Sequence, residues 1–181
     1  MKTIHYALRV AAAVCFAFIM SSGSCLSDKV EDIKFDVKLP LEFVVNETKV
    51  SQVPETYTYT KTIDATQNAE VAKYKDKIKE FKVNKITFVV SDYVAPNVVT
   101  FTNGALSVAS SGKTIASAAS VNLQSSAETE LTADTAGFNE LALLLKDDKS
   151  ESVKLKGTFS TAPVAFKVTV YFYTTITAGV L

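Results

Sequence analysis

The stretch VAFKVTVYFYTTI, residues 164–176, decides the fold class. Apolar side chains alternate there with lysine, threonine and tyrosine, which is the two-residue period of a β-strand with one buried face. The six inward side chains are Val164, Phe166, Val168, Val170, Phe172 and Ile176. Burying each contributes about 1.5–3 kcal/mol before the loss of chain entropy is subtracted. We therefore expect this strand to be central to the core.

A second stretch with the same period lies near the start of the chain, at residues 33–45, IKFDVKLPLEFVV. Its alternating apolar residues predict another long strand that is central to the core. Pro40 falls on the polar face and cannot donate a hydrogen bond to a neighbouring strand. The strand is therefore expected at the edge of a sheet, or with a bulge near its middle.

Shorter strands are predicted at residues 57–63, 83–90 and 153–159 from their apolar and threonine-rich alternation. Residues 98–108 are interpreted as a hairpin about Asn103-Gly104, because this dipeptide favours tight turns and pairs Phe101 with Leu106 on one face. Residues 109–127 are rich in serine and alanine. They are interpreted either as strands of weakly specified register or as a loosely ordered surface segment.

Two segments have the three-to-four-residue period of amphipathic helices. The first covers about residues 68–80, with Asn68 or Thr66 as its cap, and the second contains Phe138–Leu145, with Asp134 or Thr135 as its cap. The predicted fold class is mainly β, an antiparallel β-sandwich with two short amphipathic helices, and the alternative is α+β. Residues 33–181 are expected to form a single β-rich domain.

The first 24 residues are predicted to be a signal peptide. Lys2 and Arg9 give a positive n-region, Val10–Met20 form an apolar h-region, and small residues precede Cys25. An apolar run of about 11 residues is shorter than the roughly 20 that a membrane-spanning helix needs. The chain is therefore expected to be exported without a permanent protein anchor.

The junction Ser21-Ser22-Gly23-Ser24-Cys25, followed by the polar run Ser27–Asp32, resembles that of exported lipoproteins of Bacteroidetes-type bacteria. The segment VKLKGTFSTAPVAFKVTVYF, residues 153–172, placed after a late helix, is also similar to the layout of their small surface lipoproteins. The resemblance implies lipidation of Cys25, residues 25–32 as a lipid-anchored tether, and an outer-membrane location, with the domain facing either the cell surface or the periplasm. The alternative is ordinary signal-peptidase cleavage, which leaves Cys25 unmodified.

Composition narrows the functions that the exported chain can have. Of the 19 basic residues, Lys2 and Arg9 leave with the signal, so 17 lysines remain against 19 acidic residues, a formal charge of −2. This balance, without arginine, argues against a nucleic-acid partner. The only histidine, His5, also leaves, which removes the usual general base and metal ligand. We therefore expect no enzyme activity, no metal and no cofactor.

A carboxylate pair is the one catalytic arrangement that these residue types still allow. The candidates are Asp64, Asp92, Asp147, Asp148 and Glu151. Each is predicted at a turn or a helix end, where an acidic residue has a structural role.

Two pairs of tyrosines are the candidate ligand-binding residues. Tyr57 with Tyr59, and Tyr171 with Tyr173, place aromatic rings on strand faces, where sugar rings could stack or where the tyrosines could stabilise the sheet. The leading functional hypothesis is a non-enzymatic, lipid-anchored cell-envelope protein that acts as a structural or interaction module for an envelope protein partner. The alternatives are a glycan- or ligand-binding surface module and an adhesin- or fimbria-like assembly subunit that exchanges strands.

Overall fold

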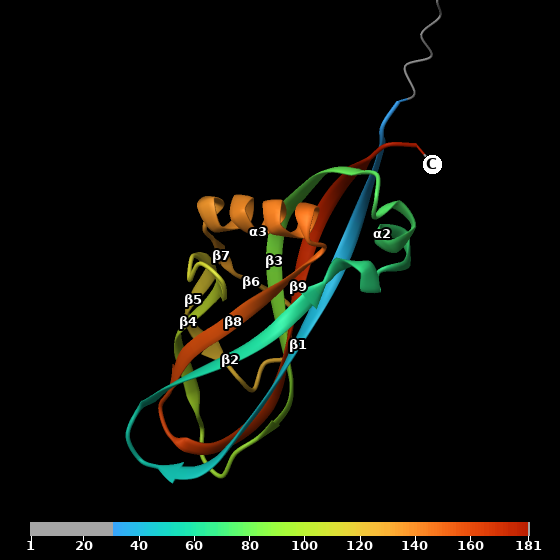
Figure 1. Cartoon of the computed structure of the whole chain (residues 1–181). Helices are drawn as coiled ribbons and strands as arrows, with labels where there is room; N and C mark the ends of the chain where they lie inside the picture. The colour runs from blue at the N-terminus through green and yellow to red at the C-terminus, as the bar shows by residue number, and fades with distance from the viewer. Residues whose placement is uncertain (1–30, 181) are drawn as a thin grey trace, which may run out of the picture. The chain divides into compact units, whose positions relative to one another are not determined.

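The computed structural model describes residues 31–180, and these residues form a β-sandwich (Figure 1). One sheet has four strands in the order β1-β9-β3-β6, and the other has five in the order β2-β8-β4-β5-β7. All strand pairs are antiparallel. The predicted fold class is confirmed. The predicted signal peptide and Cys25 lie outside the described residues.

The strands and helices follow one another along the chain as in Figure 1. They are β1 (Ile33–Ser51), β2 (Glu55–Asp64), the 3-10 helix η1 (Ala65–Gln67), α2 (Ala69–Tyr74), β3 (Ile78–Val94), β4 (Thr100–Val108), β5 (Thr114–Asn122), β6 (Thr129–Glu130), β7 (Thr132–Ala133), α3 (Thr135–Asp147), β8 (Ser150–Phe159) and β9 (Ala162–Ala178). No helix in this part of the chain combines the length and hydrophobicity needed to cross a membrane.

Strand β9 is central to the four-stranded sheet, as its alternation predicts. It pairs with β1 on one side and with β3 on the other, and Phe172 and Ile176 on its inner face are 0% exposed. The β1 register runs without interruption from the pair Ile33 and Ala178 to the pair Glu47 and Val164. Strand β1 is an edge strand, so the edge position predicted from Pro40 is confirmed and the bulge near it is absent.

The hairpin predicted about Asn103-Gly104 is wrong, because both residues lie inside the single strand β4. Thr102 pairs with Thr158 and Ala105 pairs with Lys156, so Asn103 and Gly104 together face one residue, Gly157, of β8. Two residues opposite one is a β-bulge. Asn103 has a φ of 51°, a left-handed conformation that asparagine adopts readily. The dipeptide therefore uses its turn-forming conformation to bend a strand.

The helix predicted over residues 68–80 is also too long. Asn68 caps α2 as expected, accepting hydrogen bonds from the backbone N–H groups of Glu70 and Val71, but the helix ends at Tyr74. From Ile78 onward the chain is strand β3, where Phe81 pairs with Ile176 of β9. Isolated short helices are marginal, and pairing with the central strand provides both backbone hydrogen bonds and burial.

Helix α3 confirms the second predicted helix, and Asp134 caps it by accepting a hydrogen bond from the Gly137 N–H at 2.9 Å. The helix contacts strands of both sheets (Figure 1). Gly137 allows the helix to lie directly on β5, because a Cβ there would be 1.9 Å from the Thr114 carbonyl oxygen. Strand β5 itself shows that the serine- and alanine-rich region contains an ordered strand.

Candidate functional site

The candidate site lies on the outer face of the four-stranded sheet. Strand pairing aligns Lys38 of β1, Tyr173 of β9 and Lys85 of β3 in one row across this face. Their side chains point outward because the inward positions beside them, Phe172 and Ile86, are buried in the core. Three strands that lie far apart in sequence therefore contribute one aromatic ring between two lysines.

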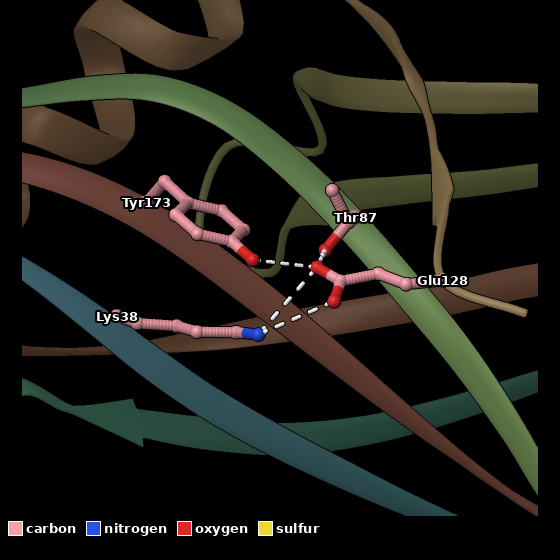
Figure 2. A network of polar contacts seen from close by, with 4 residues as sticks. All are labelled: Lys38, Thr87, Glu128 and Tyr173. Carbon is pink, nitrogen blue, oxygen red and sulfur yellow. Dashed lines mark hydrogen bonds and ion pairs between the residues drawn. The ribbon is translucent and has the colours of Figure 1, made fainter.

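Glu128, which precedes β6, contacts two residues of this row, Lys38 and Tyr173, and also Thr87 of β3, as Figure 2 shows. Its Oε1 accepts hydrogen bonds from Thr87 Oγ1 at 2.5 Å and from Tyr173 Oη at 2.6 Å. Lys38 Nζ lies 3.4 Å from Glu128 Oε2, forming a salt bridge whose side chains are 40% and 39% exposed. The Thr87 hydroxyl, followed by the Tyr173 hydroxyl and Lys38, lowers the pKa of Glu128 to about 2. Glu128 therefore stays charged and attaches the segment before β6 to the sheet.

The two tyrosines of β9 differ in how their rings are engaged. Lys38 Nζ lies 3.7 Å from the centroid of the Tyr171 ring and 5.0 Å from that of Tyr173. Lys85 Nζ lies 4.5 Å from the Tyr173 centroid. These are distances of cation–π contacts. The Tyr171 ring is thus contacted most closely by Lys38, whereas the Tyr173 ring is contacted by both lysines and also lines the surface groove described next.

A groove of about 550 Å³ opens beside Tyr173. We call it the Tyr173 groove, and its lining residues are Asp36, Val37, Lys38, Asn84, Lys85, Glu130, Tyr173 and Thr174. Its polar side chains are connected by hydrogen bonds across three strands. Asn84 Nδ2 donates to Thr175 Oγ1 at 2.8 Å, and Thr175 Oγ1 donates to Asp36 Oδ1 at 2.6 Å. The groove therefore combines carboxylate, amide and ammonium groups with one aromatic ring.

The other predicted tyrosine pair lies elsewhere and faces inward. Tyr57 and Tyr59 of β2, in the five-stranded sheet, are half-buried and pack against the core. The Tyr57 ring lies 5.1 Å from the Phe159 ring, and its hydroxyl donates to Glu55 Oε2 at 2.9 Å. The Tyr59 hydroxyl donates to Glu47. Burial raises the pKa of Tyr57 to about 12 and also raises that of Tyr59. This pair does not form an open stacking face.

The five carboxylates considered for catalysis have separate structural partners or positions. Asp64 accepts hydrogen bonds from the Thr66 N–H and hydroxyl, and Asp92 lies 3.0 Å from Lys167. The other three are at the end of α3 and the start of β8, namely Asp147, Asp148 and Glu151. Among residues 31–180, no group of three or more histidine, cysteine, aspartate or glutamate side chains is arranged to hold a metal ion.

Tyr171 and Tyr173 were predicted from the sequence, but the residues around them were not. Glu128 is 90 positions from Lys38 and 45 from Tyr173, so no local pattern connects them. Asn84 could have been noticed, because Asn84 and Lys85 are two consecutive polar residues that interrupt the alternation of residues 81–88. Such a break in alternation indicates a bulge.

No protein-family model matches the chain, and no curated protein matches it. The chain is similar to several solved structures at low sequence identity. Desmodium yellow mottle tymovirus matches at 12% identity over 89% of this chain and 97% of that chain, with a TM-score of 0.42. The decameric BFDV capsid protein matches at 8% identity over 80% of this chain and 99% of that chain, with a TM-score of 0.46. Tobacco necrosis virus matches at 12% identity, over 81% and 98% of the two chains, with a TM-score of 0.35.

Proposed function

We propose that the protein is a non-enzymatic, lipid-anchored cell-envelope protein that acts as an interaction module. The observation that carries the proposal is the sequence at the N-terminus, where a short apolar segment and the small residues Ser21–Ser24 precede Cys25. Cys15 lies within the signal, so Cys25 is the only cysteine of the exported chain, and a lipid on its thiol explains an otherwise unpaired cysteine.

The position at which the chain enters the sandwich supports a tethered display. Only the residues between Cys25 and Ile33 separate the anchor from β1, and an extended chain spans at most about 3.6 Å per residue. The anchor would therefore hold the start of β1 within about 30 Å of the membrane. Asp32 forms a salt bridge of 2.5 Å with Lys79, which ties the end of this tether to β3.

The residue types of the exported chain favour binding over catalysis. Residues 25–181 contain neither histidine nor arginine, and the candidate carboxylates have structural partners or positions. The outer face of the four-stranded sheet, with Tyr171, Tyr173 and the Tyr173 groove, is the surface that the geometry favours for contact with a ligand or an envelope partner.

The test is fractionation of bacteria that express the full chain. The wild-type protein should sediment with membranes and be released by detergent, because the lipid on Cys25 partitions into the bilayer. The Cys25→Ala variant should be soluble, and Ser22→Ala serves as a matched control with an equally small residue before the cysteine. Equal membrane association of wild type and Cys25→Ala would refute the anchor.

A second candidate, an assembly subunit, is favoured by one observation. Strand β1 is 19 residues long and lies at the edge of its sheet, so it could pair with a strand of another copy. Light scattering of the purified protein should then detect polymers, and the edge variant Val44→Pro should reduce them. Val44 is exposed and has the same alternating phase along β1 as Pro40, which pairs with β9 without a backbone N–H group. A protein that is monomeric at all concentrations contradicts this candidate.

A further inference from the structure

We propose that the Tyr173 groove binds a neutral carbohydrate. The inference deepens the proposed function, since it names the ligand class of the interaction module. Four features of the groove support it: the bulge in β3, the hydrogen bonds that fix the polar groups, the charge balance and the aromatic ring.

The bulge in β3 places two consecutive polar side chains at the groove. Val83 pairs with Thr174 and Lys85 pairs with Tyr173, so Asn84 is an extra residue between two adjacent pairs. In a regular strand, Asn84 and Lys85 would point to opposite faces of the sheet. Here both are exposed and both line the groove. Bulges reorient side chains in this way, and they occur often beside binding sites.

The polar groups of the groove are held in place before any ligand arrives. Asn84 Nδ2 and Asp36 Oδ1 are both bound to the Thr175 hydroxyl, at 2.8 Å and 2.6 Å. The carbonyl oxygen of Asn84 and the second carboxylate oxygen of Asp36 make no other hydrogen bond among the described residues, so each can accept one from a hydroxyl group of a ligand. Fixed groups of this kind bind without the full cost of ordering side chains.

The charges of the groove favour a neutral ligand. The lining residues Asp36, Glu130, Lys38 and Lys85 sum to zero, and Glu128, which pairs with Lys38, brings the formal charge of the site to −1. Lys38 is paired with Glu128, whereas Lys85 has no ion-pair partner among residues 31–180. The Lys85 ammonium can therefore donate to hydroxyl groups of the ligand. The net negative charge disfavours an anion, and the ammonium group of Lys85 disfavours a cation, so a ligand with many hydroxyls and no net charge fits this arrangement best.

The ring of Tyr173 supplies the remaining part of the site. A sugar ring has an apolar C–H face and a polar hydroxyl edge, and a tyrosine at the wall of a polar groove complements both. The volume of about 550 Å³ lies within the range of about 300–1,000 Å³ that is typical of small-molecule sites. Lys85 Nζ lies 4.5 Å from the Tyr173 ring centroid, so this flexible side chain must move off the ring when a sugar stacks there. The groove can then hold a short oligosaccharide, with its C–H face toward Tyr173 and its hydroxyls toward Asp36, Asn84 and Lys85.

The test uses the full chain purified in detergent on an array of maltotriose, cellotriose, mannotriose and N-acetylchitotriose, with sulfated and sialylated probes alongside. At least one neutral probe should bind, and calorimetric titration of that probe should give affinities about tenfold weaker for Asn84→Ala and for Lys85→Ala. Thr169→Ala, on the same face of β9 but outside the groove, is the matched control and should bind like the wild type.

Three results would overturn the assignment: no neutral probe bound by the folded wild type, binding of charged probes alone, or equal weakening by Thr169→Ala. Tyr173→Phe keeps the ring and loses only the hydrogen bond to Glu128, so it should retain binding, and a loss as large as that in Tyr173→Ala would contradict the stacking role. A protein that is anchored through Cys25 but binds no neutral probe would refute the ligand class and leave the anchor intact.

Discussion

Replacing Gly137 with alanine is expected to destabilise the protein, although alanine is the better helix former. In the middle of a helix, this change normally stabilises by up to about 1 kcal/mol. Here the added Cβ would lie 1.9 Å from the Thr114 carbonyl oxygen and 2.7 Å from Ile115 Cα. Both atoms belong to the backbone of β5, so no side-chain rotation relieves the overlap. Helix α3 must move away from the sheet.

Overpacking of this kind lowers the free energy of unfolding by about 1–3 kcal/mol. Over most of that range this loss exceeds the gain of up to about 1 kcal/mol from the better helix propensity of alanine. For a chain of this size, each kcal/mol lowers the melting temperature by about 2–4 °C. The capping bond from the Gly137 N–H to Asp134 is retained in the variant, so the change isolates the effect of the Cβ.

Urea unfolding of the purified protein at 25 °C measures the free energy of unfolding. The matched control is Ala136→Gly, at the exposed neighbouring position, which should cost no more than about 1 kcal/mol through helix propensity alone. Stability of Gly137→Ala equal to or above that of the wild type would refute the close contact between α3 and β5.

Further predictions concern the core, the Glu128 contacts and the tyrosines. Phe172→Ala should lower the free energy of unfolding, measured by urea unfolding, by about 3–5 kcal/mol, because the side chain is fully buried. Tyr171→Ala should lower it by only about 0.5–1 kcal/mol, because this side chain loses only the contact with Lys38. The pKa of Glu128 is lowered from 4.5 to about 2, so its contribution to the stability of the folded protein is complete above pH 4.5 and disappears as pH falls through about 2. Between pH 6 and pH 2.5, the urea midpoint of Glu128→Gln should therefore fall less than that of the wild type. Parallel falls in the two midpoints would contradict this. The pKa of Tyr57 is raised from 10.0 to about 12, so the contribution of its neutral hydroxyl to the stability of the folded protein is complete below pH 10 and is lost as pH rises through about 12. Tyr57→Phe should therefore lose less stability than the wild type between pH 9 and pH 11.5.

The features that could be predicted from the sequence are those specified by local periodicity. The alternation over residues 164–176 predicts β9 because every second side chain must reach the same core. Pro40 predicts the edge position of β1 through its missing backbone donor. Asp134 predicts the start of α3 because its side chain satisfies a backbone N–H group at the end of the helix.

The features that could not be predicted depend on which strands become neighbours. Asn103-Gly104 favours the same backbone conformation in a turn and in a bulge. The pairing of both residues opposite Gly157 of the adjacent strand β8 is what makes this position a bulge. Residues 75–80 fit a helical period, yet pairing with β9 makes Ile78 and Phe81 part of a strand. For the site, the contacts between Glu128 and Tyr173 arise from sheet order, which the spacing of residues does not contain.

The intact mass of the protein extracted from membranes of expressing bacteria tests the proposed anchor most directly, with Cys25→Ala as the control. A lipid-anchored protein should give a mass that corresponds to residues 25–181 plus acyl chains, and the control should give no such species. An unmodified chain that begins at or near Cys25 would contradict it, since the exported protein would then have no lipid to hold it at the membrane.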